Sequence, residues 1–390
     1  MNTNQFTGSS PVVFEIKKNR IHTFPEKPAP RVKKIPSELR KKKIDFSSEP
    51  NLIKRFIWRL KEDHQFLRST VQLAFVLLCI WIGFEFHLFM KWGMSGGESA
   101  FVERPPGVDG FLPIASLMGL LHWLYTGTVN TIHPAGVFIF IAIIGIGLLF
   151  KKSFCSWMCP VGTLSESLWM FGQKVFGRNI TVPRWLDYPL RSLKYLILAY
   201  FVWAIFGMSA QVLEAFLYSP YNRVSDIKMY LFFADISNFA LTVILILMVG
   251  SVIIKNFWCR YLCPYGALLG SLSWLSPVKI TRNTSTCIDC ELCTIACPSN
   301  VKVHKANKVH SDECMACMSC VQACPVKDCL EMRTTVTSTR VPNIVFASLI
   351  MGLFVAITGL AMLTGTWQNE IPKDEYKYHF ENIHRPMYDH

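Results

Sequence analysis

The sequence is poor in charge, and acidic residues are the scarcer part of the charge it has. Only 17% of the 390 residues are charged while 51% are hydrophobic, and a typical soluble chain has about 25% charged residues. This composition excludes an ordinary soluble enzyme and a disordered chain. Lys and Arg number 40 against 27 Asp and Glu. A basic, apolar chain indicates membrane spans with cationic flanks rather than nucleic-acid binding.

Three further absences narrow the class of protein. Fourteen cysteines in 390 residues are too sparse for a small disulfide scaffold. No C-x-x-C-H motif occurs, so we expect no covalently attached haem. The first 69 residues lack an apolar stretch of the kind found in signal peptides.

Long uncharged runs predict an integral membrane protein that is mainly α-helical. A span needs about 20 apolar residues, and five segments meet this requirement: 69–89, 134–150, 195–213, 236–254 and 341–367. Residues 110–125 are short for a span and predict a re-entrant or interfacial helix. The aromatic residues of the first span are expected to face lipid as an interfacial belt; they are Trp81, Phe84, Phe86, Phe89 and Trp92.

The distribution of basic residues predicts the orientation. With five spans, the segments 1–69, 151–194 and 255–340 lie on one side and hold 33 of the 40 Lys and Arg. The positive-inside rule places this side in the cytoplasm and the C-terminus outside. Six spans are the alternative, but they would place Lys151 and Lys152 outside, so we favour five. The basic arm before residue 70 is interpreted as a topology anchor, with anionic-lipid contact as the alternative.

The polar segment before the last span carries a strong iron–sulfur signature. The pattern C-x2-C-x2-C-x3-C-P occurs at Cys287–Cys297 and again at Cys314–Cys324. It is typical of bacterial two-cluster ferredoxins, in which the fourth cysteine of each run binds the other cluster. A zinc ribbon would have two C-x2-C pairs instead, and disulfides are disfavoured in the cytoplasm.

We therefore predict two [4Fe–4S] clusters, each with three cysteines from one run and one from the other. The ligands of cluster 1 are Cys287, Cys290, Cys293 and Cys324, and those of cluster 2 are Cys314, Cys317, Cys320 and Cys297. Cys329 and Cys79 match no ligand position and are expected to be free thiols.

A second cysteine pattern is repeated at the cytoplasmic end of two spans. Cys155-Ser-Trp-Met-Cys159-Pro and Cys259-Arg-Tyr-Leu-Cys263-Pro lie 104 residues apart, each as C-x3-C-P. Two such halves related by a pseudo-twofold axis would bring the four cysteines together, as a further iron–sulfur centre, another metal site or redox-active thiols. A pair of helix-capping turns is the structural alternative.

These motifs together resemble the membrane-bound polyferredoxins of the NapH type, with the NosR and CcoG types more distant. The resemblance covers about residues 70–367. It implies electron transfer between membrane quinol and another redox protein, in the inner membrane of a bacterium. We accordingly divide the chain as follows: a basic cytoplasmic arm (1–69), a membrane domain (70–276), an α+β ferredoxin domain (277–335), the fifth span (336–367) and a short extracytoplasmic tail (368–390).

A quinone headgroup needs a proton acceptor and a hydrogen-bond donor near the membrane surface. The candidates are Glu85, His87, His122 and His133, with Glu214 and Asp226 as weaker ones, because ionisable residues at membrane depth often have a function. The expected function is that of an electron-transfer component. The alternatives are a metal-handling factor for oxidase assembly that uses the C-x3-C-P thiols, and a redox-sensing regulator.

Overall fold

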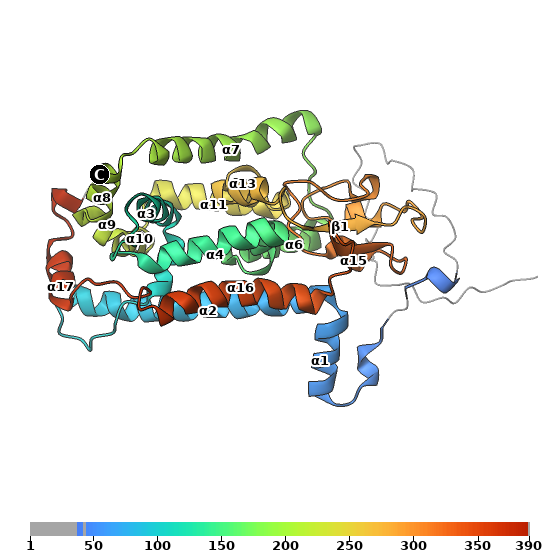
Figure 1. Cartoon of the computed structure of the whole chain (residues 1–390), viewed down its shortest axis with the longest axis horizontal. Helices are drawn as coiled ribbons and strands as arrows, with labels where there is room; N and C mark the ends of the chain where they lie inside the picture. Colours follow the sequence, from blue (N-terminus) through green and yellow to red (C-terminus); the bar gives the residue numbers. More distant parts are fainter. Residues whose placement is uncertain (1–36, 42–43, 389–390) are drawn as a thin grey trace, which may run out of the picture.

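The computed structural model describes residues 37–41 and 44–388. It is an elongated helical bundle with the cysteine-rich module at one end (Figure 1). We call this the ferredoxin end. The opposite end, which carries the C-terminal helix α17 (Lys373–Asn382), we call the distal end.

In the described residues, four helical segments are long and apolar enough to cross a membrane. They contain α2 (His64–Met94), α4 (Pro134–Phe150), α7 (Arg184–Phe206) and α16 (Asn343–Leu363). A fifth candidate is the pair α10 (Ser225–Ala234) and α11 (Asn238–Ile253), which is bent by 83°. Helix α4 is the core of the bundle because most of its residues are buried, whereas the other candidates expose long apolar faces.

One of the predicted spans differs from the structure in its bounds. The prediction of 195–213 was wrong at both ends, since α7 begins at Arg184 and ends at Phe206. Its first turns carry charges that pair with the ferredoxin end, so a search for uncharged runs misses them. The predicted fourth span, 236–254, agrees with α11 within two residues at each end, but α11 has only 16 residues and follows the bend that separates it from α10.

The two segments that carry C-x3-C-P have the same local structure, and each packs against the other. In the first segment, the short helix α5 (Phe154–Trp157) leads to Cys159, which caps α6 (Pro160–Phe176). In the second, α12 (Phe257–Tyr261) leads to Cys263, which caps α13 (Pro264–Leu272). Both capped helices begin with proline. Helix α6 packs on α11 and α13 packs on α4, so each capped helix contacts the apolar helix of the other segment. A Cβ on Gly172 would lie 1.9 Å from the Val252 carbonyl oxygen. Glycine therefore permits the close approach of α6 to α11.

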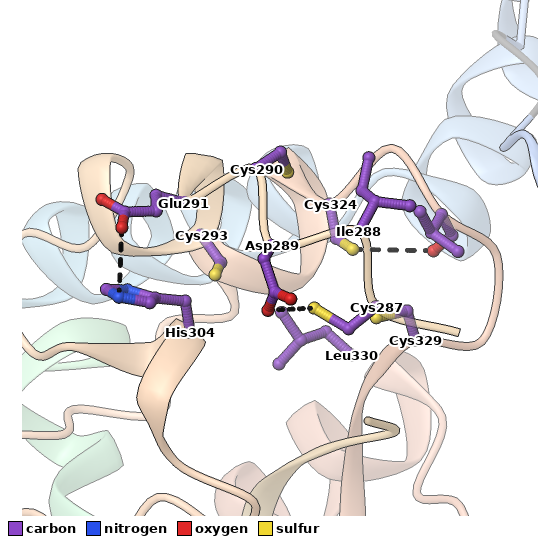
Figure 2. Close-up of a pocket in the computed structure, with 11 residues that line it drawn as sticks. Cys287, Ile288, Asp289, Cys290, Glu291, Cys293, His304, Cys324, Cys329 and Leu330 are labelled. Atoms are coloured by element: carbon purple, nitrogen blue, oxygen red, sulfur yellow. Dashed lines mark hydrogen bonds and ion pairs between the residues drawn. The ribbon is translucent and has the colours of Figure 1, made fainter. Parts of the chain in front are cut away.

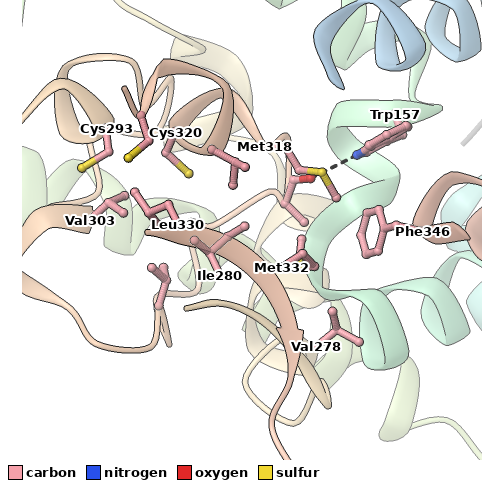
Figure 3. Packing of buried hydrophobic residues seen from close by; sticks show 14 of the residues in the cluster. Trp157, Val278, Ile280, Cys293, Val303, Met318, Cys320, Leu330, Met332 and Phe346 are labelled. Carbon is pink, nitrogen blue, oxygen red and sulfur yellow. Dashed lines mark hydrogen bonds between the residues drawn. The ribbon is translucent and has the colours of Figure 1, made fainter. Parts of the chain in front are cut away.

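The ferredoxin module is built on a small two-stranded sheet. Strands β1 (Val278–Arg282) and β2 (Leu330–Thr334) pair antiparallel, with Val278 opposite Thr334. The two cysteine runs lie between them with the short helices α14 (Leu292–Ile295) and α15 (Ser319–Ala323). The module shares a core with the membrane helices, where Trp157 and Phe346 approach Met318 and Met332 (Figure 3).

The distal end is closed by short helices and the C-terminal tail. It contains α3 (Pro113–Thr126), α8 (Ala210–Leu217), α9 (Pro220–Arg223) and the 3₁₀ helix η3 (Pro106–Phe111). Helix α17 packs on α2, so Phe86, Phe89 and Trp92 are buried. The prediction of a lipid-facing belt was wrong for these three residues; Trp81 and Phe84 are exposed as expected.

Helix α1 (Leu52–Glu62) crosses the ferredoxin end of α2 at a steep angle (Figure 1). Leu52, Ile53, Phe56 and Ile57 are exposed on one side of it. Lys54, Arg55, Arg59 and Lys61 occupy the other side at helical spacing. This is the pattern of a helix that lies in a membrane interface.

Candidate iron–sulfur sites

The first cysteine run forms most of one cavity. Cys287, Cys290 and Cys293 line it from one loop, and Cys324 lines it from the other run (Figure 2). The partition equals the one predicted for cluster 1 from spacing alone. Cys329 lines the same cavity, a placement that the sequence did not indicate because this residue lies outside both motifs.

The second run forms a second cavity. Cys314, Cys317 and Cys320 line it together with Cys297, and the rest of the lining is mostly apolar, including Ile280 and Val309. This again is the predicted partition. The assignment of these eight cysteines as ligands stays a prediction, and four thiols around each cavity fit a [4Fe–4S] cluster.

Left-handed residues shape the two loops in the same way. Asp289 and Glu291 have φ of 53° and 58° between the cysteines of the first run, and Ala316 and Met318 have φ of 49° and 57° at the corresponding places of the second. Such residues turn the chain sharply, so three closely spaced cysteines can surround one cavity.

A single metal ion and a [4Fe–4S] cube make different demands on the donor atoms. Among the described residues, no three His, Cys, Asp or Glu side chains converge closely enough to hold one metal ion. Thiolates around a single zinc lie about 2.3 Å from the metal, whereas in a [4Fe–4S] cube each thiolate binds a different iron.

As free thiols, several of these cysteines are protonated at neutral pH. Burial raises the pKa of Cys293 to about 11 and the pKa of Cys297 to about 12. A thiol binds metal only as thiolate, so cluster insertion must release these protons.

The four C-x3-C-P cysteines, which we call the membrane-edge cysteines, come together between the bundle and the ferredoxin module. Cys155 interacts electrostatically with Cys259 and Cys263, and Cys159 interacts with Cys155 and Cys263. Cys159 and Cys263 each accept a hydrogen bond of 3.4 Å, from the backbone N–H of Gly162 and of Gly266. Both therefore lie at helix N-termini, which favour negative charge.

The loop of cluster 2 is docked directly on the membrane helices. Ser156 donates to the carbonyl of Met315 (2.6 Å), and the Trp157 indole donates to that of Ala316 (3.2 Å). Gln65 of α2 donates to the carbonyl of Cys317 (2.9 Å). The second cysteine run thus contacts the segment between Cys155 and Cys159. The sequence could not reveal these contacts because the partners are more than 150 residues apart.

An acidic pair just before Cys314 completes the docking. Arg191 contacts Asp312 and Glu313 at 3.2 and 3.1 Å, Lys194 pairs with Glu313, and Tyr195 donates to Asp312 at 2.5 Å. Burial opposes ionisation, but the Tyr195 hydrogen bond and the Arg191 charge hold the pKa of Asp312 below its usual value. Lys152 and Lys194 do the same for the pKa of Glu313.

Cluster 1 lies against the N-terminal segment. Lys41 donates its backbone N–H to the Pro325 carbonyl at 2.9 Å, and Arg40 pairs with Val326. Arg282 donates to the Cys287 sulfur at 3.3 Å, while Asp289 beside it is exposed. The rest of the basic arm, before residue 37, lies outside the described residues.

The four quinone candidates at the distal end have different environments. Glu85 is partly buried on α2, and the exposed His87 contacts the Tyr230 hydroxyl at 2.7 Å. His122 is buried on α3, and its Nδ1 has no hydrogen-bond partner. His133 contacts Asp109 (2.9 Å) and the Asn222 carbonyl (2.7 Å).

Asp226 belongs to the same buried network as His133, since Arg104 bridges it to Asp109. Burial opposes both charges, yet Arg104 and His133 hold the pKa of Asp109 below its usual value, and Asp109 raises the pKa of His133. The remaining weaker candidate, Glu214, is exposed on α8.

The apolar helices and two cysteine-lined cavities define a multi-pass membrane iron–sulfur protein that acts in electron transport. The model of a 4Fe-4S binding domain matches residues 132–179 and again 238–283, and that of a 4Fe-4S dicluster domain matches 279–325. Both copies of C-x3-C-P therefore lie in matched segments. The chain belongs to the membrane-bound, ferredoxin-type electron-transport proteins, a family that includes NapH, NirI and NosR.

Three relatives illustrate the similarity. YccM of Escherichia coli (strain K12), named for electron transport, is 41% identical over 315 residues, or 80% of this chain and 88% of the relative. The ferredoxin-type protein NapH of the same strain is 23% identical over 60% of this chain and 79% of its own. Protein NirI of Paracoccus denitrificans is 29% identical over 55% of this chain but only 31% of its own. No solved structure matches the chain.

Proposed function

We propose that the protein passes electrons between the quinol pool and a partner redox protein, through the membrane-edge cysteines and then two [4Fe–4S] clusters. The observation that carries this order is the contact of the cluster 2 loop with α2 and α5. The segment after Cys324 of cluster 1 instead contacts Arg40 and Lys41 of the N-terminal segment. Electrons from the membrane therefore reach cluster 2 first, and the partner exchanges electrons with cluster 1.

The membrane-edge cysteines would hold a third redox centre. The four thiols lie within electrostatic range of one another, so thiolates there would repel each other unless a metal bound them. The N–H hydrogen bonds to Cys159 and Cys263 at helix N-termini favour the thiolate form. An iron–sulfur centre bound there accepts and donates one electron at a time. Soft thiolates also suit copper(I), so a metal-handling role is the alternative that the experiment must separate.

The orientation that fits these features places the ferredoxin end in the cytoplasm of a bacterial inner membrane. It rests on the 33 basic residues of segments 1–69, 151–194 and 255–340 and on the amphipathic helix α1 at the same end. In this arrangement α10 and α11 together form the fourth span, and the two C-x3-C-P segments are repeated halves. The distal end with α17 is extracytoplasmic.

The site of quinol oxidation is part of the proposal. His133 and the C-terminal end of α4 are separated by 17 helical residues, which is about 25 Å. A headgroup bound near Glu85, His87, His122 or His133 would thus be a helix length from the membrane-edge cysteines. Substitution of these four residues should reveal whether quinol binds at the distal end or close to the thiols.

The test uses the full chain in lipid nanodiscs under anaerobic conditions. Two [4Fe–4S] clusters contain about eight iron atoms, and a third centre raises the count. The double variant Cys155→Ser/Cys259→Ser should lose only the additional iron, while Cys79→Ser on α2 serves as the control. Copper in place of the additional iron would support metal handling, and the absence of iron altogether would refute the proposal.

A further inference from the structure

Lys152 is a buried cation among the membrane-edge cysteines. Its side chain is 2% exposed, although a lysine is rarely buried without a compensating partner. The ammonium group interacts electrostatically with Cys155, Cys259 and Cys263. A Cβ on Gly266 would lie 3.3 Å from its Nζ, so the glycine leaves space for the ammonium group next to the Cys263 cap.

The remaining electrostatic partner comes from the ferredoxin module. Glu313 interacts with Lys152 and immediately precedes Cys314 of cluster 2. Its carboxylate is also held by Lys194 and Arg191 of α7. Lys152, Lys194 and Arg191 thus share this one carboxylate, and its single negative charge does not neutralise their three positive charges.

The corresponding position of the second segment has no charge. Counting back from Cys155 and Cys259 over the 104-residue repeat, Lys152 aligns with Asn256. The Asn256 amide oxygen accepts from the Ser165 hydroxyl at 3.5 Å. The preceding lysines align as Lys151 and Lys255, and the Lys151 ammonium donates to the Val309 carbonyl at 2.8 Å instead. Of the two aligned positions, Lys152 alone carries an ammonium group, and this group interacts with Cys155, Cys259 and Cys263.

We infer that Lys152 is the charge-compensating residue of the membrane-edge redox centre and raises its reduction potential. The inference rests on the proposed function, because it assumes a redox centre at these cysteines. One electron enters from the quinol side and later leaves to cluster 2, and Lys152 keeps its proton throughout. Since the added charge is negative, a fixed cation in a poorly solvated site stabilises the reduced form.

The experiment is a redox titration of full-length protein in nanodiscs, with dithionite as reductant and each centre followed by EPR. Lys152→Met should lower the reduction equilibrium constant of the membrane-edge centre at least tenfold, or about 59 mV for one electron. Lys152→Arg keeps the charge and should restore most of the potential. Lys151→Met is the matched control, because it removes a neighbouring buried lysine that is bonded to Val309 and Ser311.

A second variant keeps the inference testable if Lys152→Met impairs folding. Glu313→Gln removes the negative charge and should raise the same potential. An unchanged potential in Lys152→Met with intact iron, or in Glu313→Gln, would overturn the inference. Failure of the proposed third centre is a distinct result: wild-type protein would then show no EPR signal that Cys155→Ser/Cys259→Ser removes.

Discussion

Replacing Gly172 by alanine should separate α6 from α11 and thereby disturb the membrane-edge cysteines. The new Cβ would lie 1.9 Å from the Val252 carbonyl oxygen, so the two backbones must move apart by more than 1 Å to reach 3.0 Å. Helix propensity alone would favour alanine by about 1 kcal/mol. Overpacking typically costs about 1–3 kcal/mol, and a backbone carbonyl cannot rotate away as a side chain can. The cost should therefore lie in the upper part of this range, about 2–3 kcal/mol, so we expect net destabilisation of about 1–2 kcal/mol.

The assay is thermal unfolding in detergent combined with iron analysis. Gly172→Ala should lower the midpoint and reduce membrane-edge iron while the ferredoxin iron is retained. Gly352→Ala is the matched control, since this glycine of α16 has no atom within 4 Å of the new methyl, and it should be neutral or stabilising. A Gly172→Ala protein as stable as wild type would refute the packing argument.

Three further predictions concern the ion pairs and the clusters. Glu166→Gln leaves Arg68 buried without its bidentate partner (2.6 and 2.7 Å) and should cost about 3–5 kcal/mol in chemical denaturation. Lys174→Met, at an exposed position of the same helix α6, should change stability by less than about 0.5 kcal/mol. The lowered pKa of Asp109 stabilises the fold above pH ~4, and the raised pKa of His133 stabilises it below pH ~6.5. Melting temperatures should therefore be highest between these two pH values. Asp109→Asn should weaken the fall in melting temperature on both the acid and the alkaline side. Removal of iron by a chelator should unfold the ferredoxin module, as seen in near-UV circular dichroism, and leave the long helices formed, because a two-stranded sheet is marginally stable alone.

The parts that depend on local spacing could be predicted from the sequence. The partition of eight cysteines between two cavities follows from the two C-x2-C-x2-C-x3-C-P runs, and the bounds of α4 follow from Pro134 and an uncharged run. The approach of the four C-x3-C-P cysteines also agrees with the prediction from their repetition.

The remaining features depend on contacts between distant residues. Helix α7 extends beyond its apolar part because Asp187 pairs with Arg260 and Arg191 with Asp312, and a hydropathy window excludes such charges. Phe89 and Trp92 are buried because α17 returns to cover them, which no local pattern indicates. Lys152 resembles any basic residue at the end of a span until folding surrounds it with cysteines.

Electron transfer through the membrane-edge cysteines to cluster 2 is the central step of the proposed function. Stopped-flow reduction by a quinol analogue in nanodiscs tests this step, with wild type compared to Cys155→Ser/Cys259→Ser. We expect quinol to reduce the ferredoxin clusters of wild type, and to reduce those of the double variant at least ten times more slowly. Dithionite should reduce the clusters of both proteins fully. Equal rates in the two proteins, or no reduction of wild type by quinol, would contradict the proposed function.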